Sequence, residues 1–245
     1  MTQVRLSYAY GTSSQPLLGM TIGEKFDQAC QQYAEQDAVV SVHQNVRLSY
    51  KQLQDQVNAF ACSLLQLGLE KGDRIAIWSP NCVEWTITQF AAFKAGMILV
   101  NLNPAYKSSE LEYVLNKVSC KALVIAPQFK SSNYQEILTK IAPEITQSTD
   151  KLLSSQRLPH LKHIIKIDHE QHSGIHRFAD LLPEPTAAQL DQLQAIAADL
   201  QFDETINIQF TSGTTGNPKG TMLTHNNILN NGYFVGEAIH LTPQD

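Results

Sequence analysis

Hydrophobic and polar positions along this chain follow the period of a helix in some segments and of a strand in others. Ser49 and Gln52 have the spacing of a capping box, in which the two residues satisfy each other's backbone N–H groups. Apolar residues then recur at helical intervals until Gly68, a residue suited to ending a helix. The pattern therefore predicts a helix between Ser49 and Gly68.

The segments that follow are shorter and change type at each turn. Residues Ser79–Asn81 supply turn and cap residues after an apolar run, and Gly96 is placed to end the next helix. Ser109 and Glu112 have the spacing of a second capping box. The pattern predicts strands at Arg74–Trp78, Met97–Val100 and Lys121–Ala126, and helices at Val83–Ala95 and after Ser109.

The second half of the chain carries a weaker pattern between Pro127 and Pro185, and a clear one after it. Apolar residues at Ile206, Ile208 and Phe210 alternate with polar ones, which is typical of a half-buried strand. The segments predicted here are helices at Tyr134–Ile141, Ala187–Leu200 and Thr224 to about Ile239, and strands at His163–Asp168 and Thr205–Phe210.

The predicted order of elements defines a fold class. Strands of nearly continuous Val, Ile and Leu alternate with amphipathic helices, which is typical of parallel sheets that are buried on both faces. The chain is therefore predicted to be α/β, with largely parallel sheets flanked by helices.

Composition excludes several classes of protein. The chain has 245 residues, of which 43% are hydrophobic, so it can bury a substantial core and is not a disordered protein. Lys and Arg total 18 against 23 for Asp and Glu, and without a basic surplus no nucleic-acid partner is predicted. The four cysteines are scattered singly, which favours free thiols in a reducing compartment and predicts a cytoplasmic protein.

No membrane span is predicted. The longest apolar stretch, residues 83–100, is interrupted by Glu84 and Lys94, and each of these charges would be costly at the centre of a bilayer. The N-terminus lacks the continuous apolar run of a signal peptide.

The segment with the clearest chemistry follows the strand predicted at Thr205–Phe210. Glycines let backbone N–H groups approach a ligand, hydroxyls add hydrogen bonds, and a lysine adds a cation suited to phosphate oxygens. A polyphosphate is the natural ligand of such a loop, although most segments of this composition are surface turns. The spacing differs from the Walker pattern, which disfavours a P-loop NTPase. The predicted phosphate-binding residues are Thr211, Ser212, Gly213, Thr214, Thr215, Gly216, Asn217, Pro218 and Lys219.

This loop resembles the phosphate-binding signature of the superfamily of AMP-forming acyl-CoA synthetases, adenylation domains and luciferases. Upstream segments agree with that family in the expected order, and several of them are most similar to medium-chain fatty acyl-CoA ligases. The segments that agree with the family are Leu48–Leu53, Gly72–Arg74, Pro80–Asn81, Glu84–Trp85 and Phe93–Pro104. Those most similar to medium-chain ligases are Asn103–Tyr106, Glu110–Leu115, Ser155–Pro159 and Ile206–Phe210.

The resemblance implies a two-step ligation. A carboxylate attacks the α-phosphorus of ATP to give an acyl-adenylate and pyrophosphate, and the thiol of coenzyme A then displaces AMP. ATP, Mg²⁺, coenzyme A and a fatty acid are the implied small-molecule partners. The loop would bind the β- and γ-phosphates, with Lys219 as its cation.

Within the family, the resemblance also implies that residues 1–245 form a truncated N-terminal AMP-binding domain. The rest of that domain and the C-terminal domain, with its adenylation lysine, would lie beyond Asp245, so no catalytic residue is assigned in this chain. Two alternatives stay open. One is a non-catalytic nucleotide-binding remnant, and the other is an enzyme that adenylates a different carboxylic acid.

Histidines and tryptophans offer weaker candidates. Five histidines lie close together in the sequence: His160, His163, His169, His172 and His176. The last two have the spacing of a zinc pair on a helix, but Gly174 argues against a helix there, so solvated loop histidines are predicted and no metal site is assigned. Trp78 and Trp85 are expected to pack in the core. His225 could border an acyl pocket, although polarity at the start of a helix explains it equally well.

Overall fold

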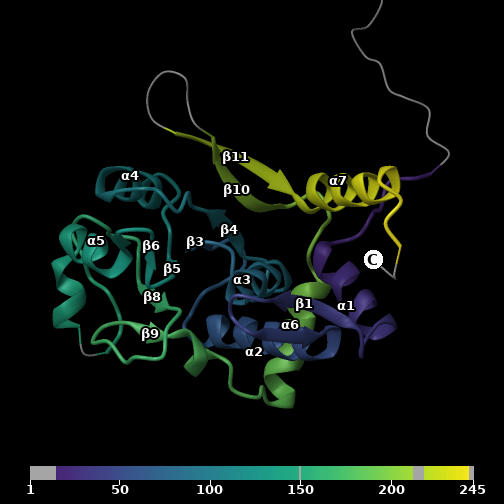
Figure 1. Ribbon diagram of the computed structural model, residues 1–245, viewed down its shortest axis with the longest axis horizontal. Helices are drawn as coiled ribbons and strands as arrows, with labels where there is room; N and C mark the ends of the chain where they lie inside the picture. Colours follow the sequence, from purple (N-terminus) through teal and green to yellow (C-terminus); the bar gives the residue numbers. More distant parts are fainter. Residues whose placement is uncertain (1–14, 149, 212–217, 243–245) are drawn as a thin grey trace, which may run out of the picture.

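The computed structural model describes residues 15–148, 150–211 and 218–242, and it shows a seven-stranded sheet with helices on both faces (Figure 1). The strands lie in the order β11-β10-β4-β3-β5-β8-β9. Two-stranded hairpins, β1-β2 and β6-β7, lie outside this sheet. The elements are α1 (Ile22–Gln32), β1 (Asp37–Ser41), β2 (Val46–Ser49), α2 (Tyr50–Gln66), β3 (Arg74–Trp78), α3 (Val83–Lys94), β4 (Ile98–Asn101), α4 (Ser108–Lys117), β5 (Ala122–Ile125), β6 (Gln128–Phe129), β7 (Ser132–Asn133), α5 (Tyr134–Ile141), β8 (His163–Lys166), β9 (His176–Arg177), α6 (Ala187–Ala198), β10 (Thr205–Thr211), β11 (Lys219–Thr224) and α7 (His225–Ala238), with short 3₁₀ turns at Pro143–Gln147 and Phe178–Leu181.

The sheet is parallel except at one edge, which confirms the predicted fold class. Strand β3 pairs in parallel with both β4 and β5, β5 with β8, and β10 with β4. Only β11, in the described part of this sheet, runs antiparallel to its neighbour, β10. The chain passes from β3 to β4 on one side and then returns across β3 to β5. The point where the strand order reverses therefore lies between β3 and β5.

Each face of the sheet has its own hydrophobic core. Ile75 and Ile77 of β3 pack with residues of α1, α2, α3 and α6, whereas Ala76 and Trp78 pack with residues of α4 and α5 on the opposite face. Alternate residues of a strand point to opposite faces, so a strand buried on both faces must be apolar throughout. This requirement explains the unbroken apolar runs in the sequence.

Helix α2 begins as its capping box predicts. The Ser49 hydroxyl accepts a hydrogen bond from the backbone N–H of Gln52, and the Gln52 side chain accepts one from the N–H of Ser49. The predicted helices α3, α5, α6 and α7 and the predicted strands also lie where the pattern places them, within a few residues.

The capping box predicted for α4 is wrong by two residues. The helix begins at Ser108, and Glu110, not Glu112, accepts the hydrogen bond from the N–H of the N-cap residue, Lys107, at 3.1 Å. Glu112 instead forms an ion pair with Arg157. Both spacings are present in the sequence, and the position of the following apolar residues against the sheet decides between them.

These two helix starts give a matched pair of variants. Ser49→Ala is expected to lower the free energy of unfolding by about 1 kcal/mol, because two backbone N–H groups lose the geometry of their cap. Ser109→Ala is expected to cost less than about 0.5 kcal/mol, since Ser109 is not the cap of α4. Urea unfolding of both variants measures the difference, and equal losses would contradict it.

Strand β10 departs from the predicted half-buried alternation. Asn207 lies between Ile206 and Ile208 and yet is only 1% exposed. A register shift between Thr205 and Asn207 sends the two isoleucines to different cores. The strand is therefore buried on both faces over its first half.

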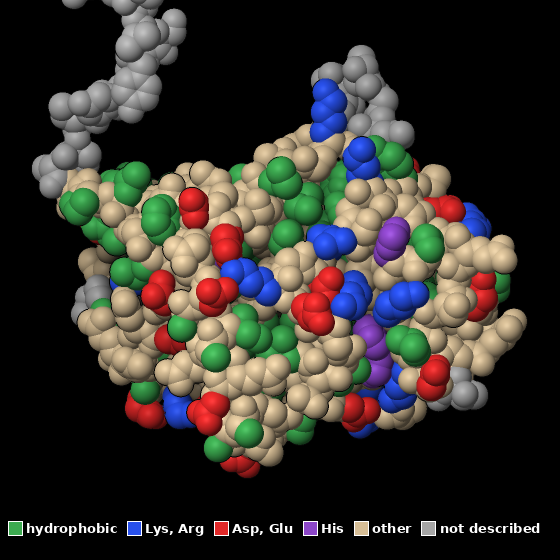
Figure 2. All heavy atoms as spheres, turned by 180° about the vertical axis from the view of Figure 1, so that it is seen from behind, with side chains coloured by type: hydrophobic (Ala, Val, Ile, Leu, Met, Phe, Trp, Pro, Cys, Tyr) green, Lys and Arg blue, Asp and Glu red, His purple; other side chains and the backbone are tan. Residues whose placement is uncertain are grey.

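The surface carries both signs of charge. On the face seen in Figure 2, Lys and Arg side chains lie among Asp and Glu side chains. Within residues 15–148, 150–211 and 218–242, none of the helices is long and apolar enough to cross a membrane. All four cysteines are free, and three of them are buried, as predicted; burial raises the pKa of the half-buried Cys82 thiol.

Candidate functional site

The predicted phosphate loop connects two antiparallel strands at one edge of the sheet (Figure 1). Thr211 ends β10, Lys219 begins β11, and the two residues pair directly. Both side chains are exposed, while Pro218 is half-buried. The other six predicted residues, Ser212, Gly213, Thr214, Thr215, Gly216 and Asn217, lie outside the described residues.

The loop leaves the sheet at a place where ligands bind in many α/β proteins. Strand β10 runs parallel to β4, so Thr211 at its end, and Lys219 paired with it, lie at the carboxyl edge of the parallel strands. In open α/β sheets this edge carries the ligand sites. The position of Thr211 and Lys219 is therefore consistent with a binding loop.

A cavity of about 470 Å³ lies against the base of this hairpin. We call it the amide cavity, because six of the nine residues that line it carry a side-chain amide. Its walls come from α3, β4, β10, β11 and the first two turns of α7. The lining residues are Trp85, Gln89, Asn101, Asn207, Gln209, Leu223, Asn227, Ile228 and Asn231.

The sequence alone does not predict this cavity. One residue in the sequence could have pointed to it: Asn207 lies between two isoleucines in a predicted strand. This is unusual because Asn is depleted in strands and rarely buried. The register of β4 and β10 was also needed to bring the amides together.

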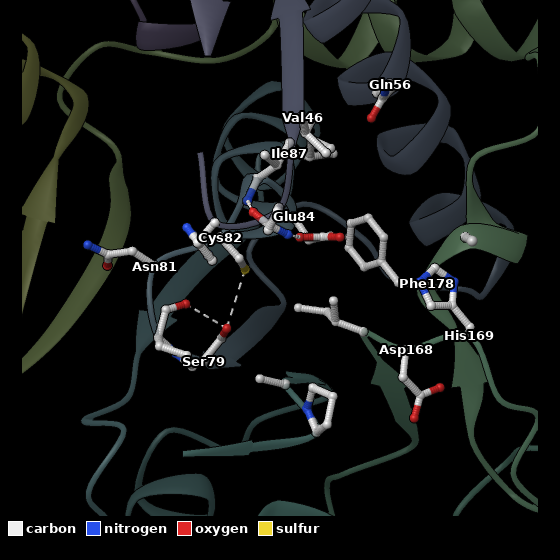
Figure 3. A pocket seen from close by; sticks show the side chains of 18 of the residues that line it. Val46, Gln56, Ser79, Asn81, Cys82, Glu84, Ile87, Asp168, His169 and Phe178 are labelled. Carbon is white, nitrogen blue, oxygen red and sulfur yellow. Dashed lines mark hydrogen bonds between the residues drawn. The ribbon is translucent and has the colours of Figure 1, made fainter. Parts of the chain in front are cut away.

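A second cavity, of about 580 Å³, lies at the carboxyl ends of β3, β5 and β8, where the strand order reverses (Figure 3). The Ser79 hydroxyl donates to the carbonyl of Pro80 at 2.7 Å and lies 3.4 Å from the sulfur of Cys82. In the described part of the chain, no basic side chain is hydrogen-bonded to this hydroxyl. Phe178, Ile87 and Val46 form apolar walls.

Two histidines on β8 and β9 have a structural position in the sheet. His163 and His176 lie on these adjacent strands, with Nδ1 of the first 3.4 Å from Nε2 of the second. Burial lowers the pKa of His176 to about 4. The prediction of solvated loop histidines is wrong for this pair, because strand pairing brings both rings against the core.

A neighbouring histidine takes part in an ion cluster. The Asp168 carboxylate lies 2.6 Å from the Lys166 ammonium and 2.9 Å from Nε2 of His172. Residues 172–176 contain no helix. In the part of the chain that the structure describes, no group of three or more His, Cys, Asp or Glu side chains could hold a metal ion.

His225 joins α7 to α1. Its ring is fully buried, and Nδ1 accepts a hydrogen bond from the backbone N–H of Ile22 at 3.1 Å. Asn230, further along α7, exchanges hydrogen bonds with the backbone of Leu18. His225 lines neither the amide cavity nor the cavity between β3 and β5, so its described role is to fix α7 beside the start of α1.

Trp78 is fully buried and Trp85 is half-buried, and both pack against apolar residues. The expected packing role is confirmed for both rings. Trp85 in addition lines the amide cavity.

A mainly parallel α/β sheet with cavities at its carboxyl edge, and a glycine- and hydroxyl-rich loop at the same edge, is typical of nucleotide-binding domains. Comparison with known families is more specific. Residues 26–245 match the AMP-binding enzyme family, and the chain belongs to that family.

Individual relatives agree with this family. The chain is 44% identical over 236 residues to "Medium-chain acyl-CoA ligase ACSF2, mitochondrial" of Macaca fascicularis, covering 96% of this chain and 38% of that protein. The resemblance to medium-chain acyl-CoA ligases is thereby confirmed, and the chain spans about two fifths of the relative's length.

Solved structures share the fold. A long-chain-fatty-acid-CoA ligase (FadD1) from Archaeoglobus fulgidus matches with a TM-score of 0.71 and 21% identity, covering 97% of this chain and 43% of that one. The anthranilate CoA ligase AuaEII, solved in complex with anthranoyl-AMP, matches with a TM-score of 0.67 and 23% identity, covering 86% of this chain and 36% of that one.

Proposed function

We propose that this chain supplies the ATP-phosphate site of an AMP-forming acid–CoA ligase. In the first half-reaction a carboxylate oxygen attacks the α-phosphorus of ATP, and pyrophosphate leaves to give an acyl-adenylate. In the second, the thiol of coenzyme A attacks the acyl carbon and AMP leaves. The observation that carries the proposal is the loop Thr211–Lys219, at the carboxyl edge of the sheet in a member of the AMP-binding enzyme family.

The loop residues have separate roles in this proposal. Backbone N–H groups and the hydroxyls of Thr211, Ser212, Thr214 and Thr215 donate to the β- and γ-phosphates, and Lys219 neutralises their charge. Transfer at phosphorus needs positioning and charge neutralisation more than covalent help, so these groups are sufficient for the loop's task. Glycines at 213 and 216 let the backbone come close to the phosphates.

Mg²⁺ enters the proposal with ATP. Within the described residues no cluster of carboxylate, histidine and thiol groups could form a metal site. Mg²⁺ is commonly held by substrate phosphates with few protein ligands, and it then neutralises the oxygens that gain charge during transfer. The hydroxyl-rich loop fits such a Mg²⁺–ATP complex. Thr211 is the hydroxyl residue of the loop that lies within the described residues.

The proposed acid is a fatty acid of medium length. This follows the named activity of the relative from Macaca fascicularis, and it is supported by the sequence segments of that type at Asn103–Tyr106 and Ile206–Phe210. Residues 1–245 would then be the N-terminal AMP-binding domain of the ligase, with the adenylation lysine outside this chain. A reducing, cytoplasmic location remains part of the proposal, on the strength of four free cysteines, although that relative is named mitochondrial.

Lys219→Ala tests the phosphate site directly. The variant is expected to bind ATP and pyrophosphate roughly 10- to 100-fold more weakly in the presence of Mg²⁺, because a charge-assisted hydrogen bond to phosphate is lost. Its free energy of unfolding is expected to change by no more than about 0.5 kcal/mol, since Lys219 is exposed. Isothermal titration calorimetry on the 245-residue chain measures the binding.

Lys25→Ala is the matched control, because Lys25 is exposed on α1, away from the hairpin. It should leave both affinities unchanged. Equal affinities for wild type and Lys219→Ala would contradict the assignment of the loop.

A further inference from the structure

The amide cavity is uncharged and rich in hydrogen-bonding groups. None of the nine described residues that line it is acidic or basic, and its six amides can each donate and accept. Its apolar lining is limited to Trp85, Leu223 and Ile228. Ligand sites are usually apolar with only a few polar groups, so this composition is unusual.

The strand register places three of these amides on one face of the sheet. Gln209 of β10 pairs with Asn101 of β4, and Asn207 pairs with Leu99, two residues earlier on that strand. Residues two apart on a strand share a face, so Asn101, Asn207 and Gln209 project toward α3 and α7. Leu99 belongs to the core on this face.

Two of these amides lack partners. The side-chain oxygens of Asn101 and Asn207 are buried without a hydrogen bond, and Asn207 is only 1% exposed. Buried polar groups are nearly always hydrogen-bonded in folded proteins, so an unpartnered pair at one cavity calls for a ligand or water. A half-turn of either amide exchanges its oxygen and its NH₂ group, so each can present a donor or an acceptor to the cavity.

The cavity lies next to the loop proposed to bind phosphates. Gln209 is two residues before Thr211 on β10, and Asn227 and Asn231 lie on α7, which follows β11 directly. An acid that attacks ATP held by this loop must place its carboxylate near the phosphates, and the cavity lies against the strands that carry the two ends of the loop.

We propose that the amide cavity binds an uncharged hydrogen-bonding group, a hydroxyl or an amide, on the chain of the carboxylic acid substrate. The inference rests on the proposed function and narrows its substrate class from medium-length fatty acids to those that carry such a group. A plain alkyl chain would cover Asn101 and Asn207 and leave both amides without water or a partner. A site built to hydrogen-bond a substrate discriminates strongly against the analogue that lacks the group.

The test compares octanoate with 8-hydroxyoctanoate on the 245-residue chain, with Mg²⁺ and ATP present. Titration followed by protein NMR is expected to show 8-hydroxyoctanoate binding at least about tenfold more tightly than octanoate. Asn207→Leu, which keeps the side-chain size but removes the amide, is expected to abolish that preference. Asn116→Leu, on α4 at the opposite face of the sheet, is the control and should retain it.

A stability measurement accompanies the binding test. Asn207→Leu is expected to unfold at an equal or higher urea concentration than wild type, because an unpartnered buried amide is replaced by an apolar group. Loss of stability would show that Asn207 has a structural partner and would overturn the inference.

Equal binding of the two acids, tighter binding of octanoate, or failure of both to bind would also overturn it. ATP binding measured in the same samples separates this failure from failure of the proposed function. If ATP binds and Lys219→Ala weakens it, the phosphate site stands whatever the acids do.

Discussion

Lowering the pH from 7 to 4.5 is expected to remove about 2–3 kcal/mol of folding free energy through His225 alone. Burial lowers the pKa of this imidazole to about 4, and Glu24 and Glu204 oppose the shift only partly. In the unfolded chain the pKa is close to 6.5. The unfolded state therefore binds more protons between these two values. The stabilisation is complete above pH 6.5 and is lost as the pH falls toward 4.

The structural cause is specific to Nδ1. This nitrogen accepts the N–H of Ile22 and must be unprotonated to do so, while Nε2 is buried without a partner. Protonation would put a charge between α1 and α7 that Glu24 and Glu204 compensate only partly. Since α7 follows directly after β11, the hairpin that carries Lys219 would lose one of its anchors.

His225→Asn isolates this contribution, because an asparagine can accept the same hydrogen bond but does not titrate. Other groups with lowered pKa values, His163, His176 and Asp168 among them, also lose stability in acid, so the comparison with wild type is essential. Urea unfolding between pH 7 and 4.5 should show a shallower pH dependence for the variant. His160→Asn, at an exposed ring, should match wild type. A slope unchanged by His225→Asn would contradict the prediction.

The strands and helices of the main sheet could be predicted because the apolar or capping character of their own residues marks where each element lies. Strand β3 is apolar from Ile75 to Trp78 because both of its faces are covered there, and α2 is marked by Ser49 and Gln52 at one end and Gly68 at the other. Thr21 and Glu24 have the same capping spacing, so the start of α1 could have been predicted as well. The apolar pattern of α1 is weak, because Glu, Lys, Asp and Gln fill most of the helix and large apolar residues recur only at every fourth position.

Strand β11 could not be predicted from its own residues. Four of its six residues are exposed, and it contains neither an apolar run nor a regular alternation. It is a strand because β10 offers an unpaired edge directly before it in the chain, which is a property of the sheet and not of the segment.

The candidate site likewise has one part that the sequence predicts and one that it does not. The phosphate loop is marked by composition, since glycine, hydroxyl and lysine residues crowd into one short segment. The amide cavity is assembled from residues as distant as Gln89 and Asn231, and only the pairing of β4 with β10 and the position of α7 bring them together. The sequence shows that Asn207 is an unusual strand residue, but it does not show which residues surround it in the folded protein.

Trp78→Ala is expected to lower the free energy of unfolding by about 3–5 kcal/mol, the largest effect of any variant proposed for this chain. The ring is fully buried and stacks on Tyr134, with centroids 3.6 Å apart and planes 14° apart. Its indole N–H also donates to the carbonyl of Asn103 at 3.1 Å. The substitution therefore removes a large apolar surface, a ring contact and a buried hydrogen bond together.

The two rings hold one turn of the backbone. Tyr134 donates its hydroxyl hydrogen to the carbonyl of Pro104 at 2.8 Å, next to the carbonyl that Trp78 binds. Both rings thus fix the chain where it leaves β4, directly after Asn101 of the amide cavity. Trp78→Phe keeps an aromatic ring and is expected to cost much less than the alanine variant, as is Tyr134→Phe, which loses only its hydroxyl.

A double-mutant cycle separates the ring contact from the rest of the loss. Trp78→Ala and Tyr134→Ala, alone and together, are expected to show a coupling free energy of about 1 kcal/mol, because stacked rings interact beyond the area that they bury. Urea unfolding of the four proteins measures it. If Trp78→Ala cost less than about 1 kcal/mol, the side chain would not be the core residue that its burial indicates. A strongly destabilised Trp78→Ala with no coupling to Tyr134 would assign the loss to the cavity and the Asn103 hydrogen bond alone.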